Sequence, residues 1–89
     1  MTNKLIKKMQ IDTMLKHLKM ALSYCSIYQD IRDLTYDPDK EVVICKYSYT
    51  MALDDKKRER TDIIEINVAC DSNSAMIKDV IERLDNFFG

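Results

Sequence analysis

The chain has 89 residues, of which 46% are hydrophobic and 33% charged, and its formal net charge is -1. This length and apolar content suit one small domain with a single core and argue against a chain that is disordered throughout. The balanced charge argues against a whole-surface nucleic-acid binder, because phosphate neutralisation needs clustered Lys and Arg. No apolar run approaches the ~20 residues that cross a bilayer, so we expect a soluble, cytoplasmic protein without membrane contact.

The first ten residues form a short basic amphipathic segment, in which Lys4, Lys7 and Lys8 alternate with large apolar side chains. The pattern leaves open whether residues 1–10 join the following helix or form a flexible basic arm. We favour a solvated terminus over an anchor for nucleic acid or membrane.

Residues 11–34 contain no glycine or proline and carry apolar residues at spacings of three and four, which predicts one helix. One apolar stripe of this helix faces the core. A second stripe lies nearly opposite the first and has no obvious intramolecular partner. We expect this second stripe to contact another protein or a second copy of the chain. The candidate protein interface therefore consists of Met20, Tyr24, Ile27, Ile31 and Leu34.

Two further segments have clear local signals. Residues 36–41 predict a turn, because Pro38 cannot continue a helix and the neighbouring Asp side chains cap backbone N–H groups. Residues 73–88 predict a final helix with one broad apolar face, and Ser72 is the preferred N-cap. We expect this helix to pack on the sheet.

The centre of the chain predicts an antiparallel β-hairpin with strands 42–53 and 61–70. Apolar side chains occupy odd positions in the first strand and even positions in the second, so each strand has one buried and one exposed face. The buried faces coincide only if odd residues pair with even ones. The connection 54–60 lacks glycine and proline, which favours a long mobile tip over a tight turn.

These elements predict an α+β fold for residues 1–89 as a single domain, in the order helix, strand, strand, helix. Helices cover one face of the antiparallel hairpin. Because a two-stranded sheet is only marginally stable and leaves both strand edges open, we expect dimerisation to complete the structure.

The sequence offers no catalytic constellation, so we expect no enzyme activity, cofactor or metal. Cys25, Cys45 and Cys70 lack paired spacing and fall on faces predicted to be buried, where cysteine behaves as a small hydrophobe. His17 is the only histidine, and no carboxylate lies at helical spacing on its face to orient it. The single glycine, Gly89, excludes the glycine-rich loops that bind nucleotides.

A nucleic-acid-binding regulator is the alternative hypothesis. Its candidate contacts lie in the N-terminal segment and at the hairpin tip, and they are Lys4, Lys7, Lys8, Lys56, Lys57, Arg58 and Arg60. Acidic residues of the tip cancel much of this charge, which is typical of a solvated loop. Tyr47 and Tyr49 alternate onto the face predicted to be core, so they form a stacking platform only if that face is open.

In size and character the chain resembles the small accessory proteins by which phages block host enzymes, anti-CRISPR proteins among them. The resemblance concerns size and composition and is carried by no residue motif. We therefore expect a non-enzymatic protein–protein interaction module, for which an inhibitor of a host enzyme complex is one concrete form.

Overall fold

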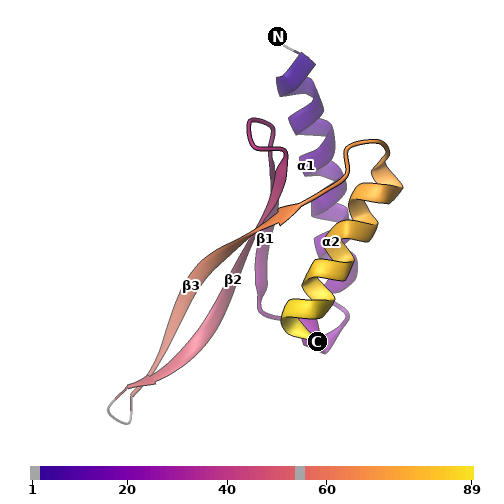
Figure 1. The fold of residues 1–89 in the computed structure, drawn as a ribbon. Helices are drawn as coiled ribbons and strands as arrows, with labels where there is room; N and C mark the ends of the chain where they lie inside the picture. Colours follow the sequence, from indigo (N-terminus) through magenta and orange to yellow (C-terminus); the bar gives the residue numbers. More distant parts are fainter. Residues whose placement is uncertain (1–2, 54–55) are drawn as a thin grey trace.

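The computed structural model describes residues 3–53 and 56–89. Both helices lie on one face of a single antiparallel sheet whose strand order is β1-β2-β3 (Figure 1). The predicted α+β fold is confirmed, with one more strand than the sequence indicated. The elements in chain order are α1 (Asn3–Leu22), the 3₁₀ helix η1 (Ser26–Tyr28), β1 (Ile31–Asp37), β2 (Val42–Leu53), β3 (Lys56–Asn67) and α2 (Asn73–Phe88).

The first helix begins earlier and ends earlier than the sequence predicted. It includes residues 3–10, so the basic segment joins the helix rather than forming a separate arm. Beyond Leu22 the backbone tightens, because the N–H of Cys25 donates to the Leu22 carbonyl at 2.9 Å, a bond of the 3₁₀ type. The prediction of one continuous helix over 11–34 is therefore wrong.

Strand β1 occupies a segment that the sequence prediction assigned to the helix and the following turn. Its register against β2 shifts between Ile31 and Asp33, where Arg32 is an additional residue. This bulge separates the buried Ile31 and Leu34 by three positions, the spacing expected of a helix. Strand alternation resumes with Tyr36, which is buried on the same face as Leu34.

The turn between β1 and β2 is shorter than the predicted range 36–41, because β1 continues to Asp37. The carboxylate of Asp37 accepts hydrogen bonds from the N–H groups of Asp39 (2.9 Å) and Lys40 (3.3 Å), which confirms the predicted capping. Glu41 has a φ of 55°, the left-handed conformation that non-glycine residues seldom adopt. Pro38 and these bonds define the turn.

A carboxylate joins α1 to strand β1. Asp12 accepts a hydrogen bond of 2.8 Å from the backbone N–H of Tyr36, and its other oxygen forms an ion pair with Lys8. Because β1 is an edge strand of the sheet, this bond satisfies a backbone donor with a side chain from the helix. The helix is thus fixed to the strand by a polar contact as well as by packing.

In the hairpin of β2 and β3, odd residues pair with even ones, as predicted. The second strand is longer than predicted. Val43 pairs with Ile66, an odd residue with an even one, and both side chains are buried. The first strand has the predicted bounds, whereas the second spans 56–67 rather than 61–70. Cys45 accordingly faces Ile64 across the sheet.

The basic part of the connection belongs to this second strand. The segment 56–60 is paired with β2, from Lys56 opposite Leu53 to Arg60 opposite Tyr49. The expectation of a long tip over 54–60 is therefore wrong for this segment, and Asp54 and Asp55 lie outside the described residues. Because both faces of these residues are exposed, no apolar alternation marked them as a strand.

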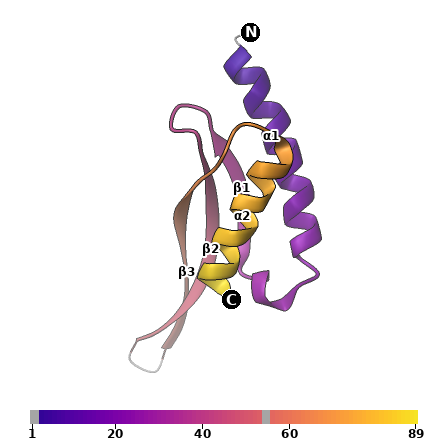
Figure 2. The ribbon, with the colours of Figure 1, turned by 45° about the vertical axis from the view of Figure 1, so that its right-hand side comes forward.

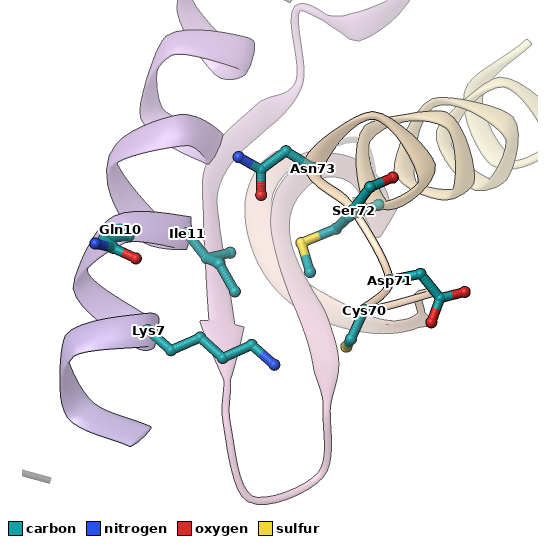
Figure 3. A pocket seen from close by; sticks show the side chains of 8 residues that line it. Lys7, Gln10, Ile11, Cys70, Asp71, Ser72 and Asn73 are labelled. Atoms are coloured by element: carbon teal, nitrogen blue, oxygen red, sulfur yellow. The ribbon is translucent and has the colours of Figure 1, made fainter. Parts of the chain in front are cut away.

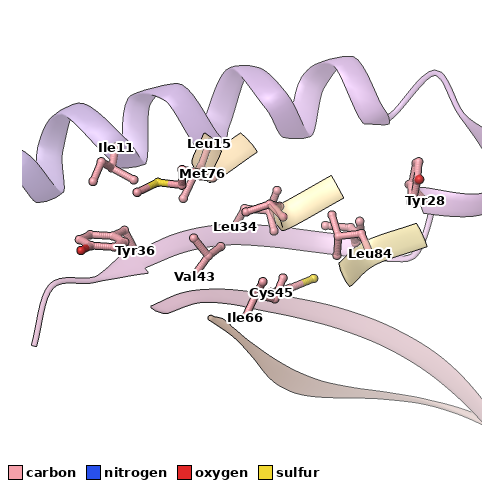
Figure 4. Packing of buried hydrophobic residues seen from close by; sticks show 12 residues of the cluster. Ile11, Leu15, Tyr28, Leu34, Tyr36, Val43, Cys45, Ile66, Met76 and Leu84 are labelled. Carbon is pink, nitrogen blue, oxygen red and sulfur yellow. The ribbon is translucent and has the colours of Figure 1, made fainter. Parts of the chain in front are cut away.

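Helix α2 has the predicted bounds, and its buried residues complete the core. The Ser72 hydroxyl accepts a hydrogen bond from the N–H of Ala75 at 3.1 Å, as expected of the N-cap. The core lies between the two helices and the sheet (Figure 4). Its buried members are Ile11, Leu15, Tyr28, Ile31, Leu34, Tyr36, Val43, Cys45, Ile66, Met76, Val80 and Leu84.

Replacing Ile66 with Asp tests the register of the sheet. Ile66 is 1% exposed, so the substitution places an unpaired carboxylate in the core and should cost more than about 3 kcal/mol of unfolding free energy. Circular dichroism on heating should show an unfolded variant. Asn67→Asp is the matched control on the exposed side and should melt as the parent does. A folded Ile66→Asp with an unchanged melting temperature would contradict the register.

Candidate protein-binding surface

The outer part of the hairpin extends beyond both helices (Figures 1 and 2). We call residues 49–53 with 56–60 the arm. Along β2 the inward side chains change from fully buried at Val43 and Cys45 to 38% exposed at Tyr49 and Met51. The arm makes the molecule elongated, with principal dimensions of 50 × 24 × 19 Å.

Strand β1 ends where the arm begins. The N–H of Ser48 donates to the Asp30 carbonyl at 2.9 Å, just before the first residue of β1. Within the described ranges, the residues of β2 beyond Ser48 pair only with β3. The arm is therefore a ribbon of two strands that carries no third strand and no helix.

One face of the arm continues the face of the sheet that carries the core, and we call its residues the inner face. Because side chains alternate along a strand, Tyr49 and Met51 lie on the same side as Val43. Directly paired residues share a face, so Arg60 lies beside Tyr49 and Arg58 beside Met51. The inner face of the arm thus includes these four residues, and the pair of Leu53 and Lys56 comes next in the register.

An aromatic cluster, which we call the root, lies where the inner face meets the end of α2. It consists of Tyr47, Phe87 and Phe88. The ring centroid of Tyr47 lies 5.1 Å from that of Phe87 and 5.8 Å from that of Phe88, both edge-on. The Tyr49 ring lies 6.0 Å from the Tyr47 ring, which makes the root continuous with the arm. Phe87 is 42% exposed, so the cluster is open to a partner.

Charges divide between the two faces of the arm. Glu59, on the outer face, forms an ion pair of 3.1 Å with Arg32 of strand β1. In the described part of the chain, neither Arg58 nor Arg60 forms an ion pair. The inner face of the arm therefore presents two guanidinium groups beside apolar side chains.

Two carboxylates lie near residues of the root in the strand pairing or in the sequence. Asp62 lies opposite Tyr47 in the sheet, and Asp85 lies in the last turns of α2. Burial and then the Asp62 carboxylate raise the pKa of Tyr47, while burial and then Asp85 raise the pKa of Tyr28. Both carboxylates are exposed, so they are accessible to a cationic group of a partner.

The predicted interface on the first helix is divided by the structure. Met20, Tyr24 and Ile27 are exposed near the end of α1 and on η1. Ile31 and Leu34 are 6% and 2% exposed and belong to the core through strand β1. The five residues therefore do not form one surface. The sequence suggested one surface because the bulge in β1 gives Ile31 and Leu34 the spacing of a helix.

The predicted nucleic-acid contacts lie at two opposite ends of the molecule (Figure 1). Lys4 forms an ion pair with Asp39, and Lys8 forms one with Asp12. Lys7 lines the cavity described below. The other four candidates, Lys56, Lys57, Arg58 and Arg60, lie on the arm. The seven side chains therefore do not converge on one nucleic-acid strand.

The cysteines have different environments, and one expectation about them is wrong. Cys25 is exposed rather than buried. Cys45 is fully buried, and burial raises the pKa of its thiol to about 11. The half-buried thiol of Cys70 lies 3.7 Å from the hydroxyl of Tyr36. Burial and then this contact raise the pKa of Tyr36 to about 12.

Within residues 3–53 and 56–89, no three or more His, Cys, Asp or Glu side chains are grouped so that they could hold a metal ion. His17 is exposed on α1.

A cavity of about 490 Å³ lies between α1 and the start of α2 (Figure 3). Lys7 and Gln10 line it from α1, while Asp71, Ser72 and Asn73 line it from the other side. The hydroxyl of Ser72 is already engaged by the N–H of Ala75. The cavity thus presents an amine, a carboxylate and the amino end of a helix.

Comparison with known proteins yields no relative. No protein-family model matches the chain, and neither a curated protein nor a solved structure matches it. Neither helix is long and apolar enough, over the residues described, to cross a membrane.

Shortening Leu34 to Ala tests whether this side chain belongs to the core or to an interface. Because Leu34 is 2% exposed, the change should remove about 2–5 kcal/mol of unfolding free energy, measured by urea titration. Ile27→Ala is the matched control, since Ile27 is 48% exposed, and should change stability by less than about 1 kcal/mol. Equal losses of unfolding free energy at the two positions would contradict this difference and would support the predicted helical stripe that contains both residues.

Proposed function

We propose that this chain is a non-enzymatic protein–protein interaction module and that the inner face of the arm, together with the root, is its binding surface. The observation that carries the proposal is the exposure of Tyr49, Met51 and Phe87 on one continuous face that no other described segment covers. Aromatic residues, Met and Arg are the types enriched where proteins bind one another.

The stability of the arm supports the same proposal. A two-stranded ribbon is at best marginally stable in water, and it gains stability when one face packs on another layer. Covering the arm with a partner buries apolar surface at about 25 cal/mol per Å². The arginines on this face suit a partner surface that carries carboxylates, because opposite charges guide association and fix its register.

An inhibitor that masks a surface of a host enzyme complex is one concrete form of this function. It agrees with the small size of the chain and with its resemblance in character to phage accessory proteins. We propose that it acts in the cytoplasm, and the three free cysteines support this, because unpaired thiols are usual in reducing compartments.

Nucleic-acid binding is the second candidate, and one observation favours it. Arg60 lies beside Tyr49 on an open face, and this combination of a guanidinium and an aromatic ring also binds single strands. Affinity for a random single-stranded oligonucleotide should then fall steeply with salt. Arg60→Gln should weaken such binding, whereas a parent protein that does not bind the oligonucleotide at low salt would eliminate this candidate.

Site-specific photo-crosslinking tests the proposed function. A benzophenone amino acid at Met51 places the probe on the inner face, and the same probe at Thr50 places it on the outer face as a matched control. Irradiation of cells that express the gene should give protein adducts from position 51 in clear excess over position 50. Mass spectrometry then identifies the adducts, and equal labelling from both positions would contradict the proposal.

A further inference from the structure

We propose that β3 pairs along its free edge with β3 of a second copy of the chain, antiparallel and about a two-fold axis at Thr61, so that two three-stranded sheets become one. The inference goes beyond the proposed function, because it uses the edge of the sheet, whereas the proposed binding surface is the inner face. Two properties of β3 select this partner: the direction of its backbone groups and the order of its charges.

Strand β3 is long, exposed and last in the order of the sheet. Its residues from Lys56 to Ile63 are all exposed. In both views β3 lies at the side of the molecule away from α1 (Figures 1 and 2). A strand edge of this kind presents a row of N–H and C=O groups with which a strand of another chain can pair.

The backbone of β2 determines which residues of β3 face this edge. The N–H of Ser48 donates to the Asp30 carbonyl at 2.9 Å, so Ser48 directs its backbone groups away from β3. Ser48 pairs with Thr61, and the two members of an antiparallel pair point either both toward or both away from each other. Thr61 therefore directs its N–H and C=O to the open edge, as do the other odd-numbered residues of β3. In agreement, the N–H of Ile63 donates to the side chain of Asp62 at 2.8 Å.

A two-fold axis at Thr61 matches these groups. The axis is perpendicular to the sheet and places odd residues opposite odd ones, so the outward N–H and C=O groups of the two copies meet and exchange hydrogen bonds. Arg60 of each copy then lies opposite Asp62 of the other. Directly paired residues share a face, so this ion pair forms twice on the side of the sheet that carries the helices.

The charges of β3 favour this register over its neighbours. Like charges directly opposite each other destabilise a pair of strands, whereas opposite charges stabilise it. An axis at Glu59, Arg60 or Asp62 sets that residue against its own copy. An axis at Ile63 sets no charged residue opposite another. Among two-fold axes centred on residues of β3, only the one at Thr61 opposes unlike charges without opposing like ones.

Pairing also gives Asp62 and Arg60 new partners. In the single chain the Asp62 carboxylate accepts the N–H of Ile63, and Arg60 forms no ion pair within the described residues. Across the axis Ile63 lies opposite Glu59, whose backbone carbonyl accepts the Ile63 N–H. The Asp62 carboxylate is thereby released to the guanidinium of Arg60 in the other copy.

The same pairing stabilises the arm. Residues 56–60 lie opposite residues 62–66 of the other copy, so the two-stranded ribbon gains a third strand on its open side. Tyr49 and Met51 belong to β2, which lies one strand inward from the new contact. The inner face therefore stays open, and a partner protein can bind it in the dimer.

Replacing Thr61 with Pro tests the edge. The substitution removes an N–H that faces the second copy and none that bonds β2, so the hairpin should fold and the ladder between copies should be blocked. Sedimentation should show association at least about tenfold weaker than that of the parent. Thr61→Val is the matched control, because it keeps the N–H and a β-branched side chain, and it should associate as the parent does. Circular dichroism checks that both variants are folded.

A charge exchange tests the register and does not depend on how the proline variant folds. In Arg60→Glu alone two carboxylates are opposed at both places, and in Asp62→Lys alone two cations are, so each should dimerise at least about tenfold more weakly. In an equimolar mixture both opposite-charge pairs are regained, so native mass spectrometry should show the heterodimer in excess of both homodimers. Lys16→Glu makes the same change of charge as Arg60→Glu on the exposed side of α1 and should leave association unchanged.

Three results would overturn the inference. They are a parent that stays monomeric from micromolar to millimolar concentration, a folded Thr61→Pro that dimerises as the parent does, and a mixture that associates no better than the separate variants. None of them affects the proposed function, because crosslinking from position 51 reports on the inner face. Equal labelling from positions 50 and 51 would conversely contradict the proposed function and leave pairing through β3 intact.

Discussion

The hairpin is longer than the helices that cover it, and this mismatch determines the rest of the structure. Each of its strands has 12 residues and is about 40 Å long, whereas the 16 residues of α2 span only about 24 Å. One end of the hairpin is packed into the core by Val43 and Ile66. Its other end must therefore leave the body, and its apolar residues remain exposed. The surface that we assign to binding follows from this difference in length.

The boundary between the core and the proposed binding surface is gradual. Cys45 is fully buried, Tyr47 is partly covered by the end of α2, and Tyr49 is open, yet all three lie on one face of one strand. A partner protein that packs on Tyr49 would continue outward the layer that α2 forms over Cys45 and Tyr47. The core and the proposed binding surface thus form one continuous apolar stripe. The outer half of this stripe lacks only the layer that the helices provide further in.

The sequence predicted the parts of the fold in which burial alternates strongly. The bounds of β2 and α2, the Ser72 cap and the odd-with-even pairing were predicted because each depends on local chemistry. Strand β1 was missed because its bulge places Ile31 and Leu34 three residues apart. The arm was missed because residues 56–60 are exposed on both faces. One feature of the sequence did indicate the arm. The apolar alternation in β2 is longer than the stretch of strand that the helices can cover.

The order of the strands has a consequence for folding kinetics. Each strand pairs with its neighbour in the sequence, so the sheet can form through contacts of low sequence separation. The helices are at opposite ends of the chain, so Ile11 of α1 and Met76 of α2 enter one core only when the whole segment between them, including the sheet, has folded. Closing this long loop is the entropically expensive step. The protein should thus form its meander early and its two-helix layer late, with the arm free throughout to meet another chain.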